Sequence, residues 1–158
     1  MSSISLPIPP TGFDTTNPAG LIYENSVPHI LFDDTTPEGI YFQFRMPSDF
    51  SSAPVLKLVY SMASAITGTI EFEVSIWAAT DGEDVDTESY DTVNNGTETV
   101  PGTAGLSSDL SITLTNADSL AANDLVRIKL FRDADDATND TATGDLELRA
   151  ATLEYTAA

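Results

Sequence analysis

The 158-residue chain contains no cysteine, a single histidine and a single tryptophan. The absence of cysteine excludes a disulfide framework, a thiolate metal site and a cysteine nucleophile. The lone histidine, His29, begins a predicted strand, and without a second histidine it favours a structural role over a metal site or a catalytic triad. The sequence also lacks a Gly-rich phosphate loop, a nucleophile elbow and a His-x-x-x-His motif. We therefore expect a protein without enzymatic activity.

Positive charge is scarce, because 25 Asp and Glu residues face only 6 Lys and Arg residues, for a net charge of -19. Nucleic acid and anionic membranes would be repelled, so neither is an expected partner. No apolar run reaches the roughly 18 residues that span a bilayer. The first residues, MSSISLPIPP, lack the basic and apolar regions of a secretory signal. The expected site of synthesis is a cytoplasm, and a basic protein or a divalent cation suits the charge as a partner.

Alternation of apolar and polar residues dominates the chain from residue 28 onward. In GTIEFEVSIWAA (68–79), Ile70, Phe72, Val74 and Ile76 share one face. The same period recurs in segments 39–46, 55–62, 110–115, 125–131 and 145–155, whereas only 116–124 suggests even a single helical turn. About eight half-buried strands joined by turn-rich loops predict an all-β fold for residues 28–158. We expect a two-sheet antiparallel sandwich with jelly-roll or Greek-key topology.

Residues 1–27 form a separate, proline-rich segment. Proline removes an amide donor and fixes φ, so neither a helix nor a central strand is expected there. Apolar side chains make the segment unlike a disordered tail, although a frayed terminus remains an alternative. We predict an extended N-terminal arm that lies on its own surface or on a neighbour's. Its candidate interface residues are Ile4, Leu6, Ile8, Phe13, Leu21, Ile22 and Tyr23.

The acidic stretch RDADDATND (132–140) raises the question of a calcium site. An EF-hand requires glycine at its sixth position and glutamate at its twelfth, and a loop starting at Asp133 has Thr138 and Gly144 there. A calcium site of another type would use the oxygens of Asp133, Asp135, Asp136 and Asp140. The alternative, which we favour, is a solvated loop whose short polar side chains cap turns. No other cofactor is expected.

Trp77 and the loop residue Tyr90 form a second open question. Trp77 falls on the polar face of its strand, so it is expected to point away from the core. An outward tryptophan stacks on sugars or anchors a protein interface, but a loop of the same chain can also cover it. We therefore count Trp77 among the candidate interface residues.

Three segments carry a resemblance to a known class of proteins: 55–79, NDLVRIKLFRDADDATND (123–140) and GDLELRAATLEY (144–155). They are similar to the small jelly-roll proteins of tailed bacteriophages, among them capsid decoration (cement) proteins. The resemblance covers roughly residues 39–156 and rests on strand pattern and on the Ile-x-Leu-x-Arg-Asp-Ala cadence ending at Ala134. The same module also serves in virion fibres and tails.

This resemblance implies a non-enzymatic virion protein that is assembled in the host cytoplasm and stabilises the outer capsid surface. It further implies a homotrimer whose second partner is the major capsid protein. Two other functions stay open. One is a carbohydrate-binding module or a fibre or tail binding domain, with or without calcium, and the other is a glycosidase with acids from two loops. Four of the six fixed positive charges fall on the last two predicted strands, namely Arg127, Lys129, Arg132 and Arg149.

Overall fold

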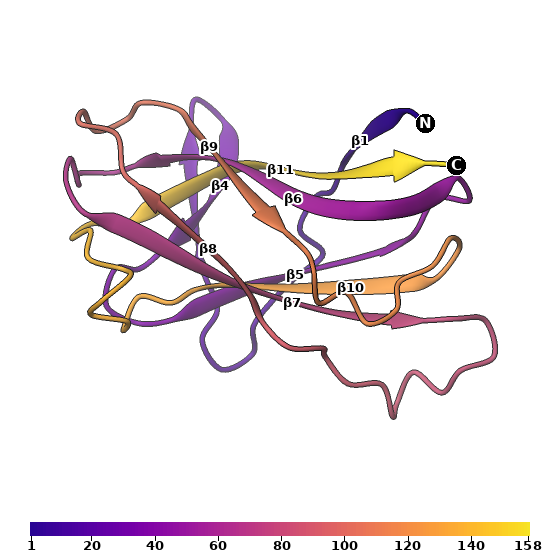
Figure 1. Cartoon of the computed structure of the whole chain (residues 1–158). Helices are drawn as coiled ribbons and strands as arrows, with labels where there is room; N and C mark the ends of the chain where they lie inside the picture. Colours follow the sequence, from indigo (N-terminus) through magenta and orange to yellow (C-terminus); the bar gives the residue numbers. More distant parts are fainter.

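The computed structural model describes residues 1–158, which fold into two antiparallel sheets packed face to face (Figure 1). Sheet A has the strand order β3 (Gly20–Glu24), β4 (Val27–Phe32), β11 (Leu146–Ala157), β6 (Phe50–Met62) and β9 (Ser108–Thr113), with β1 (Ser3–Pro7) paired to β11. Sheet B has the order β2 (Gly12–Phe13), β5 (Glu38–Arg45), β10 (Leu125–Arg132), β7 (Thr69–Ala79) and β8 (Asn94–Thr99). No helix is present that is long and apolar enough to cross a membrane.

The path of the chain from β4 to β11 is that of a jelly roll. Neighbouring strands pair as β4-β11-β6-β9 in one sheet and as β5-β10-β7-β8 in the other. Successive strands therefore alternate between the sheets, except at β7 and β8, and this order is the double Greek key of jelly-roll domains. The predicted all-β sandwich is confirmed.

The core lies between the inward faces of the two sheets. Ile70, Phe72, Val74 and Ile76 of β7 are all fully buried, as their alternation predicts. The ring of Phe72 meets Phe32 of the opposite sheet edge-to-face, with 5.3 Å between the ring centroids. Each such side chain contributes about 1.5–3 kcal/mol through burial.

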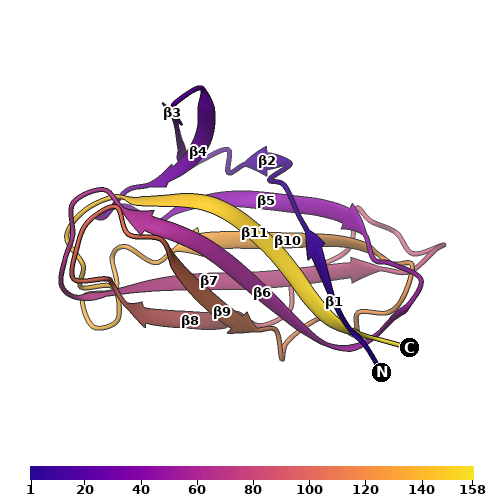
Figure 2. The same cartoon turned by 90° about the horizontal axis from the view of Figure 1, so that it is seen from above.

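The first 27 residues are extended, as expected, and they pair with strands of their own chain. β1 runs antiparallel to the second half of β11, and β2 pairs with β5 at the edge of sheet B. β3 and β4 form a hairpin that stands away from the sandwich (Figure 2). Its two-residue turn uses Asn25 and Ser26, both with positive φ, as a type I′ hairpin turn requires.

Two segments differ from the expectation. Strand β8 lies in NNGTETV, which is not among the segments predicted as strands because its polar, Gly-containing composition is typical of turns. Its pairing with β7 supplies the order that its own sequence does not indicate. Segment 116–124 contains turns but no helix, and Asp118, Ser119 and Asn123 have positive φ, which is incompatible with a right-handed helical turn.

A β-bulge at Arg149 interrupts the pairing of β11 with β6. Leu148 pairs with Tyr60 and Ala150 with Val59, so Arg149 has no partner in the register. The extra residue switches the inward positions of β11 from Leu146 and Leu148 to Leu153 and Tyr155. It also directs the Arg149 side chain toward the β3–β4 hairpin, where it bonds to Glu24.

Candidate functional site

The outer face of sheet B carries aromatic and cationic side chains in adjacent rows. The register places Gln43, Arg127 and Trp77 side by side on β5, β10 and β7. In the next row Lys129 lies between Tyr41 and Ser75. We call the group on this face the platform, and it consists of Tyr41, Trp77, Tyr90, Arg127, Lys129 and Phe131.

Arg127 and Trp77 form one end of the platform. The guanidinium carbon of Arg127 lies 4.6 Å from the centre of the Trp77 ring, within the range of a cation–π contact. Nε and Nη2 of Arg127 also donate to Oε1 of Gln43, at 3.1 and 2.7 Å. Trp77 points away from the core as predicted, but only 3% of it is exposed. Its ring therefore packs against Arg127 and offers no large exposed surface to a partner.

Lys129 occupies the middle of the platform, between two aromatic rings. Its Nζ lies 4.9 Å from the centre of the Phe131 ring and 5.9 Å from that of Tyr90. The Phe131 ring rests directly on Gly39, where any Cβ would collide with it. Glycine at this position therefore allows the ring to lie against the sheet.

Tyr41 connects the platform to the N-terminal segment. Its hydroxyl donates to Oδ2 of Asp14 at 3.0 Å, while Oδ1 of Asp14 accepts the amides of Thr16 and Asn17. The backbone bond from Asn17 is the largest of the effects that lower the pKa of Asp14. Burial, followed by the bond to Asp14, raises the pKa of Tyr41 to about 12, so the phenol keeps its proton at neutral pH. Beside it is a hollow of about 340 Å³, lined by Thr11, Gly12, Phe13, Tyr41, Gln43 and Arg127.

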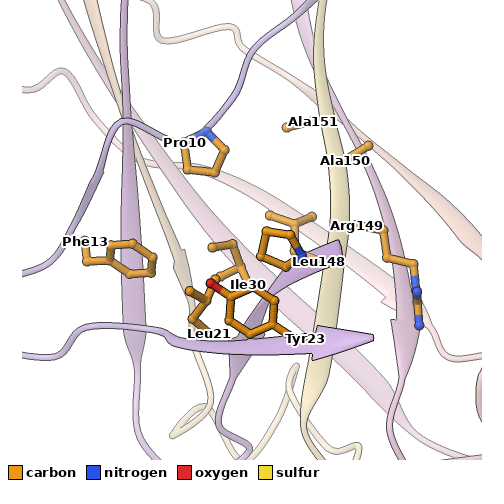
Figure 3. A pocket seen from close by; sticks show the side chains of 10 residues that line it. Pro10, Phe13, Leu21, Tyr23, Ile30, Leu148, Arg149, Ala150 and Ala151 are labelled. Carbon is orange, nitrogen blue, oxygen red and sulfur yellow. The ribbon is translucent and has the colours of Figure 1, made fainter. Parts of the chain in front are cut away.

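A second hollow lies under the β3–β4 hairpin (Figure 3). It has a volume of about 300 Å³, and the side chains of Phe13, Leu21 and Tyr23 gather around Ile30 there. We call it the hairpin pocket, and it is lined by Pro10, Phe13, Leu21, Tyr23, Pro28, Ile30, Leu148, Arg149, Ala150 and Ala151. It is mainly apolar, and Tyr23, which is 70% exposed, forms part of its rim.

Arg149 links the hairpin to the sandwich through a polar network. Its Nη2 donates to Glu24 at 2.9 Å and to Glu147 at 2.8 Å, and its Nε donates to Ser61 at 2.9 Å. The predicted structural residue His29 is buried, with Nε2 3.2 Å from Nη1 of Arg149. These contacts hold the hairpin against β11, so His29 belongs to a tethering network.

The predicted interface residues of the N-terminal arm are divided between surface and core. Phe13, Leu21 and Tyr23 line the hairpin pocket, and Ile22 is half-buried on β3. Ile8 belongs to the core, and Ile4 and Leu6 pack against it. The contacts made by Ile4, Leu6 and Ile8 are therefore within the chain.

The predicted calcium residues do not form one group. Both carboxylate oxygens of Asp140 bond to the buried guanidinium of Arg132, so Asp140 has no free oxygen for an ion. Asp135 is exposed. Asp133 and Asp136 instead come together with Glu71 of β7, with ligand atoms within 4.8 Å of one another. Asp33, Asp34 and Asp145 form a second acidic group of this kind.

Crowding of carboxylates affects the ionisation of the first acidic group. Burial, together with nearby Asp135 and Glu73, raises the pKa of Asp133 to about 6. Burial also raises the pKa of Glu71, although Asn95 and Thr97 donate to its Oε1. These acids therefore repel one another near neutral pH, and whether this loop binds calcium or is only solvated, as we favoured, stays untested.

The platform was only partly visible in the sequence. The outward positions of Tyr41, Gln43, Trp77, Arg127 and Lys129 follow from the alternation of their strands. The sequence does not indicate that β5, β10 and β7 are neighbours, and this order is what collects the residues on one surface. Phe131 follows the same alternation as Lys129 on β10, whereas Tyr90 joins the group only through the tertiary fold.

Comparison with known proteins places this geometry in a structural context. No family model and no curated protein matches the sequence. Among solved structures, the chain is similar to the CBM22-1 and GH10 modules of endo-1,4-beta-D-xylanase 10B from Clostridium thermocellum, complexed with xylohexaose. The TM-score is 0.51 and the identity 15%, over 97% of this chain and 26% of that one. Isomalto-dextranase of Arthrobacter globiformis T6, complexed with panose, gives a TM-score of 0.53 and 15% identity over 96% of this chain and 23% of that one.

A third similar structure has nearly the same length as this chain. It is a family 29 carbohydrate binding module, CBM29_1, from Piromyces equi, with a TM-score of 0.50 and 8% identity over 99% of this chain and 93% of that one. By contrast, the chain spans about a quarter of the xylanase structure. Identities this low indicate a shared architecture and nothing more specific. The chain therefore has the β-sandwich fold found in carbohydrate-binding modules.

Proposed function

We propose that this protein is a non-catalytic carbohydrate-binding module whose sugar site is the platform on sheet B. The observation that carries the proposal is the gathering of Tyr90, Phe131 and Tyr41 with Gln43, Arg127 and Lys129 on one outer face. Sugars present apolar C–H faces beside hydroxyl groups. Aromatic rings next to convergent polar side chains are complementary to both.

The rigidity of the platform supports this function. Most of its side chains project from the paired strands β5, β7 and β10, and Arg127 is held by both Gln43 and Trp77. A site built on strands needs little ordering when a ligand binds, so less of the binding free energy is lost. The hollow beside Tyr41 adds the concavity that a ligand site requires.

The fold is compatible with this function without specifying it. The similar structures include a carbohydrate binding module and two proteins complexed with oligosaccharides. Jelly-roll sandwiches, however, serve as both lectin and viral capsid domains. The proposed function therefore depends on the platform.

The direct test is isothermal titration calorimetry against a broad panel of soluble polysaccharides, with two tyrosine variants. We expect Tyr90→Ala to weaken binding about tenfold, because it removes one stacking surface. Tyr23→Ala, a matched change on the hairpin, should bind like the unaltered protein. If Tyr23→Ala is the variant that loses binding, the site lies at the hairpin pocket. An empty panel would contradict the proposed function.

Decoration of a virion capsid remains a second proposal. It is favoured by the β3–β4 hairpin, which projects from the sandwich and exposes Leu21, Tyr23 and Val27 (Figure 2). In that case a homotrimer would bind the major capsid protein through this apolar hairpin. Light scattering should then give a trimer mass, and the protein should cosediment with capsids that lack it. A monomer that stays in the supernatant would exclude this function.

A further inference from the structure

The positive charges of the platform are unusual for so acidic a chain. Of the six Lys and Arg residues, Lys57, Arg132 and Arg149 form ion pairs within 4.0 Å of a carboxylate. Arg45, Arg127 and Lys129 form none, although the chain has 25 acidic residues. All three unpaired cations project from the outer face of sheet B. The unpaired positive charge of the molecule is thus concentrated at the proposed sugar site.

Lys129 is the cation whose surroundings most resemble a ligand site. Its side chain forms no hydrogen bond within the chain and lies half-buried between the rings of Phe131 and Tyr90. An ammonium group has three donors, and none of those of Lys129 has a protein acceptor. The rings limit its contact with water and so strengthen its attraction to an anion placed there.

Arg127 offers a second cation on the same strand and the same face. It lies two residues from Lys129, a separation of about 7 Å along an extended strand. Gln43 and Trp77 occupy Nε, Nη2 and one face of the guanidinium, and the phenol of Tyr90 is a further hydrogen-bonding neighbour of Arg127. The two side chains can therefore bind a carboxylate and a neighbouring hydroxyl of the same ligand.

Asp14 lies beside this face, and Glu71 and Glu73 project from β7 on it, but none of these carboxylates forms an ion pair with Arg127 or Lys129. Asp14 is held by the hydroxyl of Tyr41 and by the amides of Thr16 and Asn17. Lys129 contributes to the lowered pKa of Asp14, but the two groups form no ion pair. Glu73 lies on β7 in the row of Phe131, one row away from Lys129.

We infer that the ligand of the platform is a polysaccharide with isolated uronic acid groups, whose carboxylate binds at Lys129 and Arg127. The inference rests on the proposed carbohydrate-binding function. The net charge of -19 favours a sparse acidic sugar over a dense polyanion, because the whole molecule repels extended negative charge. A single carboxylate on an otherwise neutral polysaccharide chain interacts mainly with the nearby cations. Its repulsion from the distant acids of the protein is screened beyond about 8 Å at physiological salt.

The test compares one polysaccharide in two forms, by calorimetry or affinity gel electrophoresis. The probes are glucuronoxylan and the same polymer after chemical reduction of its carboxyl groups to alcohols. We expect the unaltered protein to bind the acidic form about tenfold more tightly, as one charge-assisted contact provides. Lys129→Gln should abolish this preference for the acidic form. Lys57→Gln, which removes a cation from sheet A, should keep the preference.

The possible outcomes distinguish failure of the acidic-sugar inference from failure of the proposed carbohydrate-binding function. Equal binding of the two polymers, a preference that survives in Lys129→Gln, or binding of neutral polysaccharides alone would overturn the acidic-sugar inference and leave the module function intact. Absence of binding to either polymer and to every polysaccharide of the broad panel would overturn both. A preference that persists unchanged at high ionic strength would also contradict the inference, because a contact between partly exposed charges weakens as salt rises.

Discussion

Arg132 occupies a position where the alternation of β10 would place an apolar residue. It follows Val126, Ile128 and Leu130 on the inward face, and like them it is fully buried. Its guanidinium bonds to Asp140 at 2.9 and 2.8 Å and to the carbonyl oxygens of Ala142 and Gly144 at 3.0 and 2.9 Å. One buried cation thereby anchors the loop that follows β10.

Replacement of Arg132 should be strongly destabilising. We expect Arg132→Met to lower the free energy of unfolding by about 3–5 kcal/mol, because Asp140 would remain as a buried charge without a partner. Urea denaturation followed by circular dichroism measures this change. Lys57→Ala, which breaks an exposed pair, is the control and should cost less than about 1 kcal/mol.

A second substitution distinguishes the buried charge from lost packing. Arg132→Met combined with Asp140→Leu should recover part of the stability, since no unpaired ion remains. Recovery should be incomplete, because the carbonyls of Ala142 and Gly144 still lack donors. A single variant as stable as the control would show that the ion pair has no structural role.

At the level of strands, β1 determines how the edge of sheet A is closed. Its five residues pair with Thr152–Thr156 of β11, and the amide of Ala157 donates to the carbonyl of Ser2 at 2.8 Å. The two ends of the chain therefore lie side by side (Figure 2). Without β1, this half of β11 would become an exposed edge strand, which is a template for pairing with other chains.

Deletion of residues 1–7 should therefore affect both stability and association. We expect the free energy of unfolding to fall by about 1–3 kcal/mol, through loss of the packing of Ile4 and Leu6. The shortened protein should also self-associate as its concentration rises. Thermal unfolding and light scattering at several concentrations check the two effects. Unchanged stability would mean that β1 does not pair with β11 in solution.

At the scale of the whole molecule, the excess of acids makes stability depend on pH. Burial raises the pKa of Asp133 to about 6 from a usual value of 3.8, and it raises that of Glu71 as well. In contrast, hydrogen bonds lower the pKa of Asp33 and Asp136. A group whose pKa is higher in the folded protein than in the unfolded chain stabilises the fold once it is protonated. A group whose pKa is lower in the folded protein stabilises the fold only while it is ionised.

The sign of the dependence follows from these directions. As the pH falls from about 7.5 to about 5, the folded protein takes up protons at Asp133 before the unfolded chain does, so the melting temperature should rise. Below about pH 4 the unfolded chain takes up protons at Asp33 and Asp136 before the folded protein does, so stability should fall again. Differential scanning calorimetry across this range measures the profile. Asp133→Asn should reduce the rise in melting temperature between pH 7.5 and 5. A rise as large as that of the unaltered protein would show that other groups cause it.

Much of the sandwich follows from the chain alone, because the strands obey a simple period. Alternation in the sequence shows the inward rows of β7 and β10. On β11 the same alternation changes its parity between Leu148 and Leu153. Burial of every second side chain requires this pattern, so fold class is encoded locally. Strand β8 escapes the rule because its order comes from pairing with β7 and not from its composition.

Only the tertiary structure decides which side chains meet. Alternation gives the face on which Arg127, Lys129 and Tyr41 lie, but strand order and register place them in adjacent rows. The same applies to Asp140, which the sequence places in an acidic loop expected to be solvated, whereas packing buries it against Arg132. Composition determined the acidic charge, and the alternation of apolar and polar residues determined the β-sandwich. Both are properties of single segments of the chain. The platform and the buried ion pair were decided by contacts between distant segments, whose geometry exists only after the sheets have packed.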